Sequence, residues 1–304
     1  MYRTFVILRH TFKESIVQPI YSLLLAIGAA TLIIFMALPF FTFGEDTIMF
    51  KAVGLDLILI LVLIATLFAT SKSIYEEIED RTMLTLMSKP VQKWEVLVGK
   101  YLGIITAALL AMAILGAILI LATWWRIPGD YMMRANSIDD AERTRLLDTR
   151  LMHIAGLLPE LFLRWLQVSV LAAIGVAIST RLSLVVNLPV VILVYVAGNL
   201  TRFLFPMDSP GSPLHDSGPF VRGLAYVMSL ILPYLETFDL RQKTVYSTIA
   251  LAGTRFANEI NAVTTSELWT YAATATLYAA AYVFFALCAG MWSFQTRELG
   301  GAEG

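Results

Sequence analysis

The chain has little cysteine, little histidine and few charged residues. Its 304 residues include one cysteine and three histidines, and only 15% are Asp, Glu, Lys or Arg. The single cysteine, Cys288, excludes an intramolecular disulfide. A formal net charge of -1 provides no basic surplus, so we expect no nucleic-acid partner. No internal repeat or low-complexity linker divides the sequence, and we interpret residues 1–304 as one integral domain.

Apolar residues dominate the composition instead. They make up 58% of the chain, more than a soluble domain needs for its core. A helix needs roughly 20 mainly apolar residues to cross a bilayer. The sequence therefore predicts an all-α polytopic membrane protein with six transmembrane helices, near residues 20–41, 53–69, 101–124, 161–179, 184–205 and 268–292.

Two further apolar stretches are predicted to lie at the membrane surface. Phe5, Leu8, Phe12 and Ile16 recur at helical spacing, which predicts an amphipathic interfacial helix before the first span. Residues 220–235 are interrupted by charge, glycine and proline, which leaves too few apolar residues for a crossing. We interpret this second stretch as a re-entrant or interfacial helix before the sixth span.

Basic residues near the span ends indicate the orientation. If the N-terminus is inside, the cytoplasmic segments hold Arg3, Arg9, Lys13, Lys72, Arg81, Lys89, Lys93, Lys100, Arg181 and Arg297. Most other basic residues lie in the long connections 126–160 and 206–267, where the charge rule is weaker. We therefore expect both termini in the cytoplasm. The mixed charges of residues 139–152 predict a solvated helix in the first of these connections.

The segment between the second and third spans, residues 73–100, carries the densest charge. Its acidic residues are expected to stand in the first turns of a helix: Glu76, Glu77, Glu79 and Asp80. Arg81 follows one of them at the spacing of an i,i+4 ion pair. Pro90 predicts a bend, after which Trp94 meets the interface and Lys100 marks re-entry into the bilayer. The pattern predicts a short helix, a bend and a second short helix, which could carry force from a soluble partner into the membrane.

Residues 77–103 resemble the coupling region of ABC exporter membrane subunits of the type-two permease class, the ABC-2-like family. The likeness consists of an acidic helix, a Thr-Leu pair, a proline and a later lysine, and the matching positions are Thr82, Leu84, Pro90 and Lys100. Two further elements are similar to those of the family. One is Leu-Pro-Tyr-Leu-Glu-Thr-Phe-Asp-Leu-Arg at 232–241, and the other is the short turn at 179–183.

The resemblance implies a permease subunit that works in a pair, as a homodimer or a heterodimer, with two ABC ATPase subunits. It also implies a location among the lipids of the bacterial inner membrane. ATP and magnesium are then expected on the partner ATPase, with no cofactor or metal in this chain. We expect no enzyme activity here, because the chain has no Gly-x-x-x-x-Gly-Lys-Ser/Thr loop. The residues expected to couple to the ATPase are Glu76, Glu77, Glu79, Asp80, Arg81, Thr82, Leu84, Lys89, Pro90, Trp94 and Lys100.

Two other functions fit part of the pattern. A non-transporting membrane anchor of a soluble complex could use the same charged segment, although six spans and long outer connections favour transport. An intramembrane protease is suggested by Glu-Glu-x-x-x-Arg at residues 76–81. That class needs histidines on membrane helices to bind a metal. The three histidines, His10, His153 and His215, lie outside the predicted spans.

Several polar residues lie in or near the predicted spans. We interpret Asp56, Arg164 and Arg202 as close enough to span ends for their side chains to reach water. Asn187 stands before a proline in the fifth span and is expected to satisfy the carbonyl freed by the kink. Neither these residues nor Asn199 are predicted to bind substrate, and the substrate itself is not indicated by the sequence.

Overall fold

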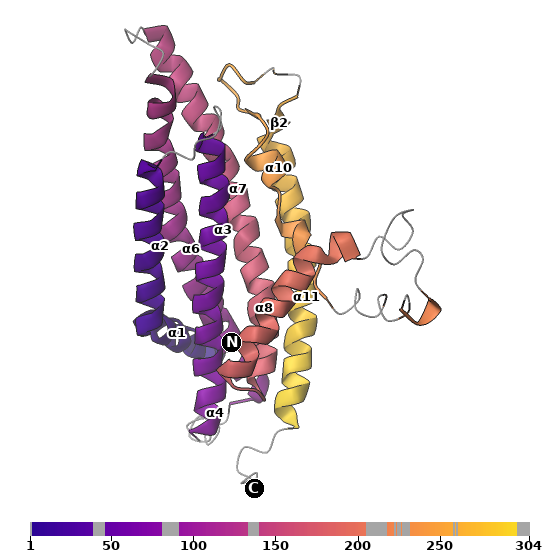
Figure 1. The fold of residues 1–304 in the computed structure, drawn as a ribbon. Helices are drawn as coiled ribbons and strands as arrows, with labels where there is room; N and C mark the ends of the chain where they lie inside the picture. The colour runs from indigo at the N-terminus through magenta and orange to yellow at the C-terminus, as the bar shows by residue number, and fades with distance from the viewer. Residues whose placement is uncertain are drawn as a thin grey trace.

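Long helices form almost all of the structure, which is a computed structural model (Figure 1). It describes residues 2–38, 46–80, 91–132, 140–204, 218–221, 223, 226, 232–257, 259 and 261–296. Within these residues, five helical stretches are long and apolar enough to cross a membrane: Pro19–Ala37, Asp46–Glu79, Lys93–Ile127, Glu142–Ser179 and Thr265–Gln295. The prediction of an all-α polytopic membrane protein is confirmed.

The five stretches belong to α2 (Pro19–Ala37), α3 (Asp46–Thr70) with η1 (Ser71–Glu76) and α4 (Glu77–Glu79), α6 (Lys93–Met132), α7 (Asp140–Ser179) and α11 (Thr265–Gln295). The predicted span 184–205 falls on α8 (Leu184–Leu204), most of which is a shorter apolar helix, Leu184–Leu200. Six crossings therefore stay a prediction. The short elements are α1 (Tyr2–Val17), η2 (Leu235–Phe238), α10 (Arg241–Thr244) and the parallel strands β1 (Ile249–Ala250) and β2 (Val263–Thr264).

The bundle has two distinct ends. Figure 1 shows α1, α4 and the last turns of α11 at one end, which we call the α4 end, and α10 and β2 toward the opposite end, which we call the loop end. Residues 232–257 pack against α7 and α8. Half of the predicted re-entrant helix at 220–235 lies outside the described residues, so it stays a prediction.

The predicted N-terminal helix is present as α1, which crosses the bundle at the α4 end and packs on α6 (Figure 1). Two glycines of α6 allow this contact. A Cβ at Gly103 would lie 2.8 Å from the carbonyl oxygen of Leu8, and one at Gly99 would lie 3.0 Å from that of Thr4. The helix buries small polar residues such as Thr11 and packs Phe12 and Ile16 against the apolar core, whereas Phe5, nearer its start, is 61% exposed.

The charged stretch in the first predicted connection is helical from Asp140, and Glu142, Arg143 and Arg145 are exposed, as predicted for a solvated helix, but it is not a separate element. The charged stretch 139–152 and the predicted span 161–179 belong to one 40-residue helix, α7, which runs through Pro159. The helix continues because α6 packs along it and α10 and β1 pack against its first half. A Cβ at Gly156 would lie 2.1 Å from the carbonyl oxygen of Thr244, so only glycine admits this contact.

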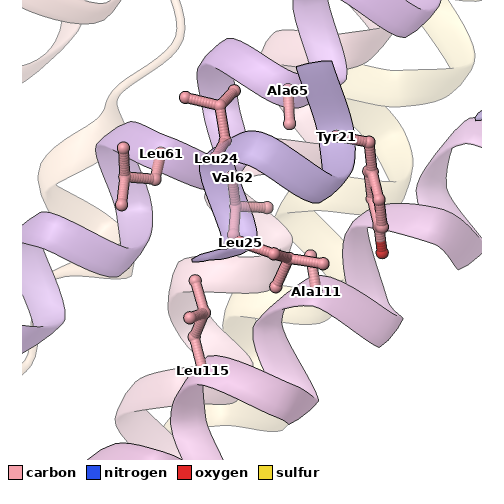
Figure 2. A pocket seen from close by; sticks show the side chains of 8 residues that line it. All are labelled: Tyr21, Leu24, Leu25, Leu61, Val62, Ala65, Ala111 and Leu115. Atoms are coloured by element: carbon pink, nitrogen blue, oxygen red, sulfur yellow. The ribbon is translucent and has the colours of Figure 1, made fainter. Parts of the chain in front are cut away.

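The apolar core follows the helices from one end to the other. Between α2, α3 and α6, a small pocket is surrounded by side chains from all three helices (Figure 2): Tyr21, Leu24, Leu25, Leu61, Val62, Ala65, Ala111 and Leu115. The hydroxyl of Tyr21 donates to the carbonyl oxygen of Ala107 at 2.9 Å, which satisfies the one polar atom that this residue brings into the core. A second apolar cluster joins α7, α8 and α11 to η2.

Candidate functional site

The predicted coupling helix is a direct continuation of α3. The helix passes through one π-helical stretch, η1, and ends in α4. Ile74 and Ile78 are 1% and 7% exposed, so one face of this extension is anchored in the core. Glu76, Glu79 and Asp80 are exposed at the opposite face and tip. A π-helical turn inside an α-helix is rare and is frequently found at functional sites.

Lys100 clamps this extension to α6. Its Nζ lies 2.6 Å from Oε1 of Glu77. It also donates to the backbone oxygen of Ser73, and to Oγ of Ser73 at 3.2 Å. The Lys100 side chain is only 4% exposed, a burial that its position before an apolar run did not indicate, and its marking of re-entry into the bilayer stays a prediction. Its charge is neutralised within the protein.

The predicted second short helix is not separate either. α6 begins at Lys93 and continues without a break into the membrane span, because no proline stands between Lys93 and the apolar run. Trp94 is 45% exposed in its first turn. Five residues predicted to couple to the ATPase lie outside the described residues: Arg81, Thr82, Leu84, Lys89 and Pro90. The predicted ion pair between Glu77 and Arg81 stays a prediction, because Arg81 lies outside the described residues.

Asn187 connects the extension of α3 to α7 and α8. The side chain is fully buried, and its Nδ2 donates to Oγ of Ser179 at 2.8 Å and to Oγ of Ser71 at 3.1 Å. The side chain therefore joins three helices where α3 becomes η1, and its amide nitrogen does not bond the carbonyl freed by the proline that follows. The signal in the sequence was an amide in an otherwise apolar run, but its partners could not be identified from spacing.

Five charged side chains form a second cluster, toward the loop end. Oε1 of Glu160 lies 3.1 Å from Nε of Arg164, and Nη2 of Arg164 lies 3.2 Å from Oδ2 of Asp239. Nη1 of Arg241 lies 2.6 Å from Oδ2 of Asp56, and its Nη2 lies 2.6 Å from Oδ2 of Asp239. The Arg164 side chain is 2% exposed, so the interpretation that it reaches water from a span end is wrong. Its charge is balanced by carboxylates from three segments of the chain.

This charge cluster attaches residues 239–244 to α7. The Glu160 side chain is 0% exposed, and its Oε2 accepts from the backbone N–H of Leu240 at 3.2 Å and from the hydroxyl of Thr244 at 3.0 Å. Burial acts to raise the pKa of Asp239, but hydrogen bonds and charge from Arg241 and Arg164 outweigh it and hold that pKa below its usual range. The sequence offered no signal for these pairs, because Glu160 and Leu240 are separated by 80 positions.

The pattern of the ABC-2 family transporter proteins matches residues 9–299, nearly the whole chain. The chain belongs to the ABC-2 family. This confirms the resemblance drawn from residues 77–103. A comparison with curated proteins gave no match. As an ABC-2 protein the chain is a transmembrane permease that serves transport, and members of this family normally work with ATPase subunits.

In this ABC-2 chain, His153 lies at the opposite end of the bundle from Glu76 and Glu77, so it does not meet the Glu-Glu-x-x-x-Arg segment as a protease of that class would require. Nδ1 of His153 lies 2.9 Å from Nζ of Lys51, at the loop end. Glu76 and Glu77 lie at the α4 end. Within the described residues, no group of three or more His, Cys, Asp or Glu side chains could hold a metal ion. Of the other polar residues, Asn199 accepts from Gln167 at 3.5 Å, and the side chain of Arg202 lies outside the described residues.

Proposed function

We propose that this ABC-2 chain is the permease subunit of an ATP-binding cassette exporter. A separate ATPase subunit hydrolyses the ATP and binds the accompanying magnesium, and two permease chains assemble with two ATPases. One observation carries the proposal. The exposed acidic tip of α4 is continuous with the membrane helix α3, and its base is clamped to α6 by a buried ion pair.

This geometry would let α3, η1 and α4 move together as one rigid lever. A push on the tip cannot be absorbed by a flexible joint, because the helix runs from Asp46 to Glu79 without a break. Lys100 passes the displacement to α6 through Glu77 and Ser73. Asn187 passes it to α7 and α8. A small displacement of these helices can switch a packed bundle between discrete arrangements.

The lever also supports an orientation. An ATPase that hydrolyses cytoplasmic ATP must meet the α4 end, which therefore faces the cytoplasm. α1 and the end of α11 lie at the same end (Figure 1), so both termini are cytoplasmic. A bacterial inner membrane suits this arrangement. The charge cluster around Glu160 and Arg164 then lies nearer the outer side.

The substrate path is assigned to the face of α3 that carries Asp56. Its side chain is 44% exposed although α3 is a membrane span, and a charged group facing lipid there would be costly. We place this face toward water between the two permease chains, where Arg241 and Asp56 form one polar edge.

Co-purification from membranes tests the function. The tagged chain should bring down an ATPase subunit, and ATP hydrolysis by the complex should respond to changes at the α4 tip. Charge reversal at the exposed tip, Glu79→Lys with Asp80→Lys, should weaken ATPase binding about tenfold, which corresponds to about 1.4 kcal/mol. Glu142→Lys reverses an exposed acid at the far end of α7 and should have no effect.

A second variant separates docking from coupling. Glu77→Ala removes the clamp and leaves the exposed tip intact, so the ATPase should still bind while its turnover no longer responds to transport. If the chain purifies without any nucleotide-hydrolysing subunit, or if the tip reversal leaves ATPase binding unchanged, the exporter proposal fails. A membrane anchor would bind its partner without any change in ATP turnover.

A further inference from the structure

An apolar groove runs between α7 and α11 in the half of the bundle near the α4 end. Its volume is about 410 Å³, and it is lined by Ile174, Ala177, Ile178, Tyr282, Phe285, Ala286 and Ala289. The two helices touch beside it, because a Cβ on Gly290 would lie 2.9 Å from Cα of Ala177. The three alanines keep the groove open where larger side chains would fill it.

The groove leads to an arginine. Arg181 stands one turn beyond Ala177 and Ile178, and its Nε donates to Oγ of Ser293 at 3.1 Å. Ser293 is one turn beyond Ala289 on the facing helix, so the two residues stand at the end of the groove. Nη2 of Arg181 also donates to the backbone oxygen of Ser293 at 3.2 Å. The guanidinium is thereby held in one orientation.

Arg181 has no anionic partner within the described part of the chain. Its contacts there are hydroxyl and carbonyl oxygens, and the residue is exposed. Lys93 lies at the same end of α11 and donates to the backbone oxygen of Phe294 at 3.3 Å. Two positive charges therefore stand at the α4 end of a groove whose lining is apolar apart from the hydroxyl of Tyr282.

We propose that this groove binds an anionic phospholipid. One acyl chain occupies the space between α7 and α11, and the headgroup phosphate bonds Arg181. The groove and the arginine together match a phospholipid in both shape and charge. An apolar helix from a second copy could fill the groove but would supply no anion to the arginine, which has none among the described residues, whereas a phospholipid supplies a chain and a phosphate together. The proposal does not depend on the ATPase or on export.

Native mass spectrometry of the purified full chain tests the proposal. The protein is equilibrated with mixed micelles that contain equal amounts of dioleoyl phosphatidylglycerol and dioleoyl phosphatidylcholine. The native chain should retain phosphatidylglycerol about tenfold over phosphatidylcholine, because phosphatidylglycerol carries a net negative charge, whereas the choline ammonium of phosphatidylcholine offsets the charge of its phosphate. Arg181→Gln should abolish this preference, and Arg181→Lys should keep most of it.

Two further variants make the outcome specific. Ala289→Leu places a larger side chain in the groove and should reduce retention of both lipids at least fivefold. Arg145→Gln removes an exposed arginine near the other end of α7 and should leave the preference intact. Arg181→Lys serves as the folding control, because it retains the positive charge at the site.

Three results would overturn the proposal. Retention of neither lipid by the native chain would mean that the groove holds no phospholipid. An unchanged preference in Arg181→Gln would place the anionic headgroup elsewhere. Loss of a dimer in Ala289→Leu, with lipid retention unaltered, would show that a second copy of the chain fills the groove.

Discussion

Replacement of Glu160 by leucine should release the loop-end segment from the bundle. The carboxylate is the centre of the buried charge cluster, with a 0% exposed side chain that contacts Arg164, the backbone N–H of Leu240 and the hydroxyl of Thr244. Leucine is similar in size but can accept none of these bonds. Arg164, whose side chain is 2% exposed, would lose its nearest negative partner.

The magnitude follows from this burial. Removing one partner of a buried ion pair typically costs about 3–5 kcal/mol, because the remaining charge stays in a medium that solvates it poorly. Arg164 keeps Asp239 at 3.2 Å, so we expect the lower part of that range. A loss of about 3 kcal/mol raises the open population of residues 239–245 by a factor of roughly 100.

Cysteine accessibility measures this opening directly. Val245 is 2% exposed and lies next to Thr244, so a cysteine placed there reacts with a maleimide only when the segment opens. The native Cys288 is exposed and is replaced by alanine in the parent chain. Glu160→Leu should accelerate labelling of Val245→Cys roughly 100-fold when opening is fast relative to labelling.

Two comparisons make the result decisive. Glu142→Leu changes an exposed acid on the same helix and should leave the labelling rate near that of the parent. Glu160→Leu with Arg164→Leu removes both buried charges and should label more slowly than Glu160→Leu alone. A Glu160→Leu rate within twofold of the parent would refute the reasoning, because the carboxylate would then not hold the segment.

Three further predictions concern close contacts and pH. Gly156→Ala places a Cβ 2.1 Å from the carbonyl oxygen of Thr244, so it should cost about 1–3 kcal/mol and speed labelling at the same cysteine, and an unchanged rate would contradict the contact. The folded pKa of Asp239 lies below the ordinary pKa of an aspartate, so its stabilising contribution is present above that ordinary value and is lost as the pH falls through the folded pKa. Thermal unfolding should show this loss at acid pH, and Asp239→Asn, which lacks the titrating group, should show a smaller one. Gly103→Leu should detach α1 and expose it to limited proteolysis, whereas Leu102→Ala, at an exposed neighbour, should not.

The helices were predictable from composition because the requirement is local. A stretch of apolar residues long enough for the bilayer must form a helix wherever it occurs, so the predicted spans at 20–41, 53–69, 101–124, 161–179 and 268–292 all fall on membrane-length helices. Their ends were less predictable. α7 extends to Asp140 because packing by α6, α10 and β1 supports a charged stretch that has no apolar signal of its own.

The coupling segment, too, was predictable from the sequence only in part. Its position between two spans and its exposed acids could be read from the residues, and Glu76, Glu79 and Asp80 are indeed exposed. The role of Lys100 could not, because a lysine before an apolar run is typical of a span end. Only the tertiary structure brings Glu77 and Ser73 to it from the preceding helix.

The sequence by itself determined the membrane class, most spans and the family, since apolar length and the order of residues along 77–103 are properties of the chain alone. The tertiary structure decided which charges are paired. Arg164 was indistinguishable in the sequence from a side chain that reaches water, and its partners Asp56 and Asp239 come from distant segments. Burial of a charge depends on what surrounds it in space, and that follows from packing between helices.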